Sequence, residues 1–189
     1  MHPVPRRAPT SEAEAFGALV EEHQVAVYNL CYRMLGDPDQ AEDAAQETFL
    51  RGFRSRHGLD PARPARTWLL SIAAHHCIDV LRRRARLAWL PLEDRPLPEP
   101  GPGPEESLER SEADSDLQRR LRRLGPEERA VIALRYWQNL SVEEIATVTS
   151  SSANAVRTRL YRARRTLAAA DLAPQPPTVR EMHGEPRAV

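Results

Sequence analysis

The residues that could carry chemistry lie together between positions 141 and 165. Six polar or basic residues fall on one face of a predicted helix there: Asn154, Arg157, Thr158, Tyr161, Arg162 and Arg165. Arginine and asparagine can form paired hydrogen bonds with base edges, and arginine, threonine and tyrosine also bind phosphates. A solvated basic face on an amphipathic hairpin is the simpler alternative, but the mixture of residue types favours nucleic-acid binding.

Two capping signals place these residues on a helix-turn-helix. Ser141 and Glu144 form a capping box, which predicts a helix that begins at Val142. Ser152 can cap a second helix that runs to about Ala169, and both serines are themselves candidate DNA contacts. An apolar stripe opposite the polar face must pack against a core: Val156, Leu160, Ala163 and Leu167. This arrangement would place the second helix in the major groove.

The composition indicates an all-α protein of one or two small domains. The 189 residues include only eight glycines, and no long stretch alternates polar and apolar residues as a strand would. No apolar run approaches the roughly 20 residues of a membrane span, and no signal peptide opens the chain. Cys31 and Cys77 show no metal-ligand spacing, so a reducing, cytoplasmic location is expected.

The charge is zero overall but strongly segregated along the chain. Residues 1–50 hold nine acids and three arginines, and residues 92–116 hold nine acids and two arginines. Residues 51–91 hold nine arginines and two acids, and residues 117–171 hold eleven arginines and five acids. Two basic blocks separated by acidic ones predict two separate contacts with a polyanion.

The first 86 residues predict three helices with unlike surfaces. The helices are expected at residues 11–35, 39–53 and 65–86, with a break at Gly36 to Pro38 and another after the second helix. The second helix leaves an acidic face, formed by Asp39, Glu42, Asp43, Gln46 and Glu47. The third helix ends in four arginines that could bind phosphates: Arg82, Arg83, Arg84 and Arg86.

The run of His75, His76 and Cys77 raises the question of a metal site. Neighbouring positions on a helix point about 100 degrees apart, so the three side chains cannot converge on one ion. No second pair of ligands follows them in the sequence. We therefore predict neither a metal nor any other cofactor.

These features divide the chain into two small helical domains. Residues 11–86 and 117–171 form the domains, and an acidic, proline-rich linker at residues 87–116 joins them. The linker holds six prolines and cannot bury enough apolar surface to fold alone, so we expect it to be flexible. Residues 1–10 and 172–189 are expected to be disordered.

Several segments resemble the extracytoplasmic-function (group IV) sigma factors of the sigma-70 family, the promoter-specificity subunits of bacterial RNA polymerase. Residues 39–50 (DQAEDAAQETFL) are similar to the helix by which the family docks on polymerase, and residues 68–84 are similar to its minus-ten segment. Residues 124–129 (LGPEER), 134–136, 140–146 and 156–167 are similar to its minus-thirty-five domain. The family usually has asparagine where His75 stands, and often glycine where Ser150 stands.

The resemblance implies two partners, core RNA polymerase and promoter DNA, with an anti-sigma factor as a third expected partner. Docking on the clamp helices of the beta-prime subunit would use Asp39, Glu42, Asp43, Gln46, Glu47 and Leu50, and the beta flap would be a further polymerase contact. The minus-ten element would contact Arg54, Arg66, Trp68, His75, Asp79, Arg82, Arg83, Arg84 and Arg86, and the loop from Arg54 to Arg66 would receive a flipped base. The minus-thirty-five element would contact Ser141, Ser152, Asn154, Arg157, Thr158, Tyr161, Arg162 and Arg165.

A free-standing transcriptional regulator, with a ligand-sensing or dimerising first domain, is the main alternative. Such a protein would bind DNA without polymerase, usually as a dimer on a palindrome. The acidic face and the long linker argue against it. An enzyme with an appended DNA-binding module is a third class, but the sequence shows no nucleophile–base pair and no metal cluster. The predicted function is therefore that of a sigma factor, which recognises promoters, melts DNA and initiates transcription.

Overall fold

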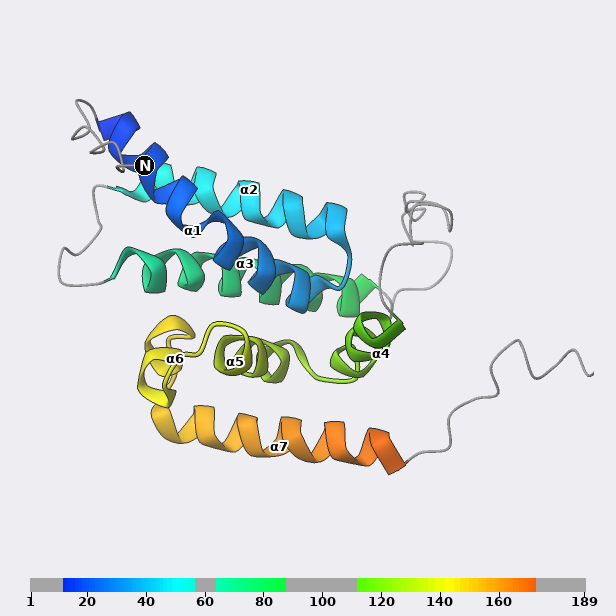
Figure 1. The fold of residues 1–189 in the computed structure, drawn as a ribbon. Helices are drawn as coiled ribbons and strands as arrows, with labels where there is room; N and C mark the ends of the chain where they lie inside the picture. The colour runs from blue at the N-terminus through cyan, green and yellow to red at the C-terminus, as the bar shows by residue number, and fades with distance from the viewer. Residues whose placement is uncertain (1–11, 57–63, 88–111, 173–189) are drawn as a thin grey trace, which may run out of the picture.

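The computed structural model describes residues 12–56, 64–87 and 112–172, and these residues are helical with no strand among them (Figure 1). Seven helices follow in order: α1 (Glu12–Leu35), α2 (Pro38–Ser55), α3 (Ala65–Leu87), α4 (Glu112–Leu121), α5 (Pro126–Tyr136), α6 (Val142–Val148) and α7 (Ala153–Leu172). Helices α1–α3 form one layer, here called the first bundle, and α4–α7 form a second layer against it, here called the second bundle (Figure 1). The expected all-α class is confirmed.

The first bundle is held together by apolar stripes that the sequence spacing predicts. Val27, Leu30 and Met34 on α1 and Leu69 and Leu70 on α3 are completely buried. Burial of a leucine side chain stabilises a fold by about 1.5–3 kcal/mol. His23 and Cys31 lie on the same α1 stripe and are buried, as expected for core residues.

The break between α1 and α2 has a clear local cause. Gly36 adopts a left-handed conformation with a φ of 74°, which ends α1. The Asp37 carboxylate then accepts the backbone N–H of Gln40 at 3.0 Å, and Pro38 occupies the first turn of α2. Helix α2 therefore begins one residue earlier than predicted, and it ends two residues later than predicted.

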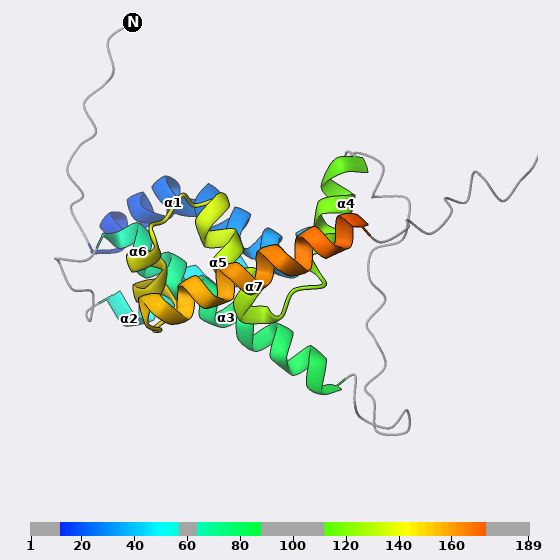
Figure 2. The same ribbon diagram turned by 90° about the horizontal axis from the view of Figure 1, so that it is seen from below.

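The middle of helix α5 is buried on all sides. Its residues from Arg129 to Leu134 are all buried, although an amphipathic surface helix would expose one side. The cause is its position in the middle of the protein: α1 and α3 of the first bundle contact it on one side, and α6 and α7 contact it on the other (Figure 1). Figure 2 shows the same helices from the side of α7.

The second bundle begins earlier in the chain than the sequence predicts. The sequence predicts flexible linker up to residue 116, whereas α4 begins at Glu112. Asp114 accepts hydrogen bonds from the Tyr32 hydroxyl at 2.7 Å and from Arg33 at 2.5 Å, which fix this first turn of α4 to α1. The remainder of the predicted linker, residues 88–111, lies outside the described residues.

Candidate DNA and polymerase interfaces

The helix-turn-helix forms as the sequence predicts. Helix α6 begins at Val142 behind a complete capping box, in which the Glu144 amide donates to the Ser141 hydroxyl at 3.1 Å and the Ser141 amide donates to the Glu144 carboxylate at 2.7 Å. These bonds hold the pKa of Glu144 below its usual value. The Ser152 hydroxyl accepts the Ala155 amide and caps α7. Ser150 occupies the left-handed turn position with a φ of 49°, a conformation that a glycine would adopt with less strain.

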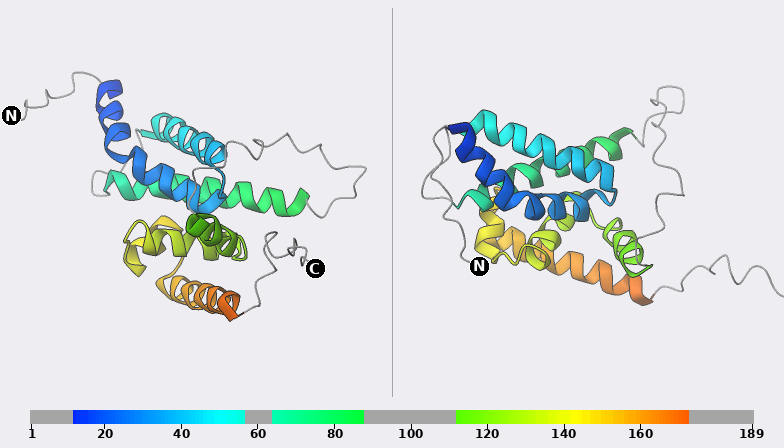
Figure 3. Two further views of the ribbon diagram at one scale, coloured as in Figure 1. Left: turned by 45° about the vertical axis from the view of Figure 1, so that its right-hand side comes forward. Right: turned by 45° about the horizontal axis from the view of Figure 1, so that its top comes forward.

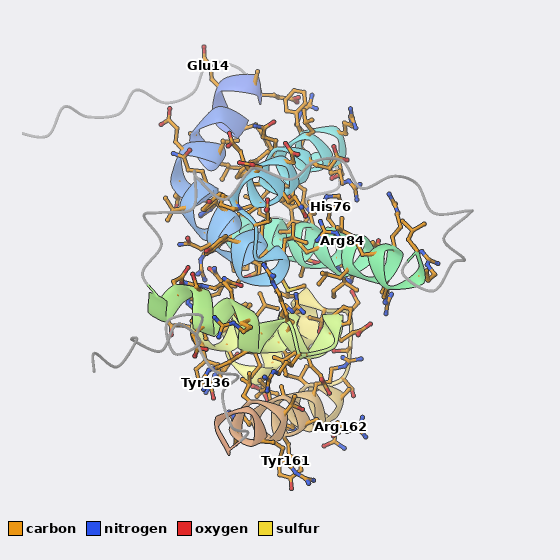
Figure 4. The ribbon with its side chains drawn as sticks, turned by 90° about the vertical axis from the view of Figure 1, so that its right-hand side faces the viewer. Glu14, His76, Arg84, Tyr136, Tyr161 and Arg162 are labelled. Atoms are coloured by element: carbon orange, nitrogen blue, oxygen red, sulfur yellow. The ribbon has the colours of Figure 1, made fainter. Side chains whose placement is uncertain are left out.

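Six of the predicted minus-thirty-five contacts lie on the outer face of α7, whereas Ser141 and Ser152 cap the two helices of the motif. Tyr161 is 60 % exposed, and Figure 4 shows Tyr161 and Arg162 pointing away from the rest of the protein. Arg165 lies over the Tyr161 ring, 5.8 Å from its centroid. Arg157 is exposed and forms an ion pair with Glu143 of α6 at 3.1 Å. Asn154 and Thr158 are exposed on the first turns of the same helix.

The acidic face of α2 is exposed as predicted. Four of its members point into solvent: Asp39, Glu42, Asp43 and Gln46. Leu50 is 51 % exposed at the end of this face, which is unusual for a leucine and gives the surface an apolar component. Glu47 accepts a hydrogen bond from Arg51 at 2.6 Å, and this bond lowers the pKa of the Glu47 carboxyl.

A groove beside the acidic face was not predicted from the sequence. It has a volume of about 450 Å³ and runs between α1 and α2. It is lined by Val20, Gln24, Val25, Tyr28, Glu42, Ala45, Gln46 and Phe49. Val25 is 67 % exposed. A valine outside the buried stripe of α1 was the signal in the sequence that could have indicated this groove. The groove and the acidic face together form one surface suited to a protein partner.

The predicted minus-ten residues on α3 are divided between solvent and the second bundle. Those facing the second bundle are Arg66, His75, Asp79 and Arg82. The Arg66 guanidinium donates to the Gln138 side chain at 2.8 Å and to its carbonyl at 3.1 Å. The Arg82 guanidinium forms an ion pair with Glu127, with one hydrogen bond of 2.9 Å. The sequence did not predict these pairs, because their members are 72 and 45 residues apart.

The other predicted minus-ten residues are not among those that face the second bundle. Four are exposed: Arg54, Arg83, Arg84 and Arg86. Figure 4 labels Arg84 among them. Trp68 is partly buried against the core of the first bundle. The loop predicted to receive a flipped base is largely outside the described residues, since positions 57–63 are not described.

The histidine run behaves as helix geometry predicts. His75 is exposed and its Nδ1 lies 2.8 Å from the Ser71 carbonyl, whereas Cys77 is buried. Burial lowers the pKa of His76. Within the described residues no group of histidine, cysteine and carboxylate side chains could hold a metal ion. No helix in those residues is long and apolar enough to cross a membrane.

Comparison with known proteins places both bundles in one family. Residues 19–87 match Sigma-70 region 2, and residues 114–167 match Sigma-70 region 4. The chain therefore belongs to the sigma-70 family, specifically to the extracytoplasmic-function (ECF) sigma factors, whose members it resembles over most of its length. It is a sigma factor and not an enzyme.

Two curated relatives and one solved structure show how similar this chain is to known proteins. The chain is 38% identical over 151 residues to the ECF RNA polymerase sigma factor SigE of Mycolicibacterium smegmatis, covering 79% of this chain and 58% of SigE. It is 32% identical over 165 residues to SigW of Bacillus subtilis, covering 82% of this chain and 88% of SigW. The structure of CnrH in complex with the cytosolic domain of CnrY matches with a TM-score of 0.62 and 29% identity, covering 85% of this chain and 90% of CnrH.

Proposed function

We propose that this chain binds core RNA polymerase and directs it to promoters in the cytoplasm. The observation that carries the proposal is the presence of two exposed surfaces of opposite charge on separate bundles. The acidic face of α2, with its adjoining groove, suits a protein partner, and the arginine-rich face of α7 suits DNA. A protein that bridges polymerase and promoter requires both surfaces at once.

The α2 surface is proposed to dock on the clamp helices of the beta-prime subunit, and the beta flap is a further proposed contact. Asp43 and Gln46 are exposed at the centre of the acidic face, and Gln46 also lines the groove. An anti-sigma factor is the other proposed partner. The relative CnrH was solved with the cytosolic domain of CnrY bound, which supports a protein partner for this fold.

The docking proposal is tested by a double variant, Asp43→Arg with Gln46→Ala. We expect it to lose core-polymerase binding and run-off transcription while keeping its helical circular dichroism spectrum. Glu22→Arg on α1 is the matched control, because Glu22 is exposed but lies away from the groove. Equal capture of core polymerase by parent and double variant would refute the docking assignment.

The outer face of α7 is proposed to contact the minus-thirty-five element, and we test it with Arg157→Ala and Arg162→Ala. A base contact predicts a loss of about 1–3 kcal/mol and relaxed preference at one position of a randomised element. A phosphate contact predicts weaker binding to all sequences and a smaller salt dependence. Arg164→Ala is the control, since Arg164 donates to the Tyr136 hydroxyl at 3.0 Å on the flank of α7. Unchanged base preference in both variants would refute base recognition by these arginines.

A further inference from the structure

One ion pair joins the two helices of the helix-turn-helix on their exposed side. The Arg157 guanidinium of α7 donates to the Glu143 carboxylate of α6 at 3.1 Å. The pair bridges the turn between these helices, which Figure 3 shows from two further sides. The Arg157 side chain is 57% exposed and that of Glu143 is 68% exposed, so DNA can reach both of them.

Arg157 differs in this respect from the other arginines of the proposed minus-thirty-five face. Arg165 lies over the Tyr161 ring, and Figure 4 shows Arg162 pointing away from the protein. Within the part of the chain that the structure describes, neither of these two arginines forms an ion pair with a carboxylate. The structure therefore neutralises one arginine of this face and leaves two with their full charge.

Both members of the pair stand on helix ends that local bonds fix in place. Glu143 lies in the first turn of α6, directly behind the capping box, and its own carbonyl accepts the Thr147 hydroxyl at 3.1 Å. Arg157 lies near the start of α7, where the Ser152 hydroxyl accepts the Ala155 amide at 3.1 Å. The distance between the two backbones is thus set by the fold, and the pair forms without any change in either helix.

The chemistry of the pair favours a base edge over a phosphate as the DNA partner of Arg157. A guanidinium has several N–H donors, and one bond to Glu143 leaves the others available for the O6 and N7 acceptors of guanine. A phosphate carries a full negative charge, so the Glu143 carboxylate repels it more strongly than it repels a neutral base. A guanidinium that already has a partner also loses less conformational freedom when it binds.

We propose that Glu143 determines part of the sequence specificity of α7, acting through its ion pair with Arg157. Glu143 is a positioning residue, which restrains the Arg157 guanidinium and lowers its attraction for phosphates. Both effects raise the ratio of specific to non-specific DNA binding. The inference rests on the proposed function, because it requires Arg157 to contact DNA.

The test compares holoenzymes formed from core RNA polymerase and the full-length chain. Each selects from promoters with a randomised upstream element, and its affinity for a duplex of unrelated sequence is measured in parallel. Glu143→Ala removes the carboxylate, and helical circular dichroism checks that each variant is folded. This change is combined in turn with Arg157→Ala and with Arg162→Ala, the matched control, whose arginine lies on the same face of α7.

We expect Glu143→Ala to bind the unrelated duplex about twofold to threefold more tightly and to relax the preference at one base position about twofold to fivefold. The changes are modest because exposed ion pairs are weak. The effect should persist in the Arg162→Ala background and disappear in the Arg157→Ala background, since only residues that act through each other show such coupling.

Arg157→Ala alone separates failure of this inference from failure of the proposed function. If it relaxes a base preference while Glu143→Ala does not, the DNA contact of Arg157 stands and the role of Glu143 is refuted. The role is also refuted if Glu143→Ala has the same effect with and without Arg157. If neither single variant changes any base preference, base recognition by Arg157 is refuted as well.

Discussion

The replacement Arg129→Met tests whether the second bundle completes the fold of the first. The Arg129 side chain is 6% exposed, and its two terminal nitrogens donate to the Met34 carbonyl at 2.7 Å and to the Leu124 carbonyl at 3.2 Å. Methionine has a similar length and no polar hydrogen, so the variant removes both bonds with little change in packing volume.

Two opposing effects set the size of the change. A hydrogen bond to a charged group contributes about 1.5–3 kcal/mol, and each carbonyl left without a partner in the interior costs about 1–3 kcal/mol. Against this, burial disfavours the guanidinium charge and lowers the pKa of Arg129 to about 10, and its Nε has no partner. Removal of the charge therefore recovers part of the loss. We expect a net loss of about 2–4 kcal/mol in the free energy of unfolding.

Urea unfolding at pH 7, followed by helical circular dichroism, measures the loss. For a chain of this size it corresponds to a fall in Tm of roughly 5–12 °C. Arg123→Ala is the control, because surface substitutions usually change stability by less than about 0.5 kcal/mol. An Arg129→Met variant as stable as this control would contradict the reasoning, since it would mean that the cost of burying the guanidinium cancels both bonds.

Three further outcomes are expected. Gly36→Ala should destabilise the protein by about 1–2 kcal/mol in thermal unfolding, because the φ of 74° disfavours alanine and the new Cβ would lie 3.3 Å from the Arg122 Nε; unchanged stability would contradict the left-handed cap. Ser141→Ala should cost about 1 kcal/mol by the same measurement, because the backbone N–H of the third residue of α6 loses its 3.1 Å partner; no loss would show that water replaces the cap. Burial lowers the pKa of His76, because the folded protein favours the neutral imidazole. The resulting contribution to stability is fully present above the unfolded-state pKa and is lost as the pH falls through the folded-state pKa. Stability measured from pH 7.5 to 5 should therefore fall less in His76→Gln than in the control His75→Gln, and equal slopes would contradict this.

Local rules were sufficient to predict the helices and the faces that they expose. The capping box at Ser141, the cap at Ser152 and the glycine turn at Gly36 depend on residues within a few positions of one another. The outer face of α7 and the acidic face of α2 follow from helical spacing in the same way. Helical spacing alone therefore predicts that both faces are exposed, while the DNA and the polymerase that they would contact remain proposals.

The groove beside α2 and the start of α4 required the tertiary structure. Val25 contributes to the groove because α1 packs against α2 at that point. The spacing of apolar residues in a sequence does not predict where two helices cross. Helix α4 begins at Glu112 because Asp114 meets Tyr32 and Arg33, more than 80 residues earlier. The acidic segment around it has too few apolar residues to fold without that contact.

The sequence by itself predicted an all-α protein with two helical units, an acidic face on the second helix and an arginine-rich face on the last helix. These properties follow from helical periodicity, capping and charge, which act over a few residues. Only the tertiary structure decided that the two units pack on each other, that Glu127 and Gln138 hold two of the predicted DNA-contacting arginines, and that Arg129 completes α1. Those pairs join residues 45 to 95 positions apart, and their formation depends on how two folded surfaces meet.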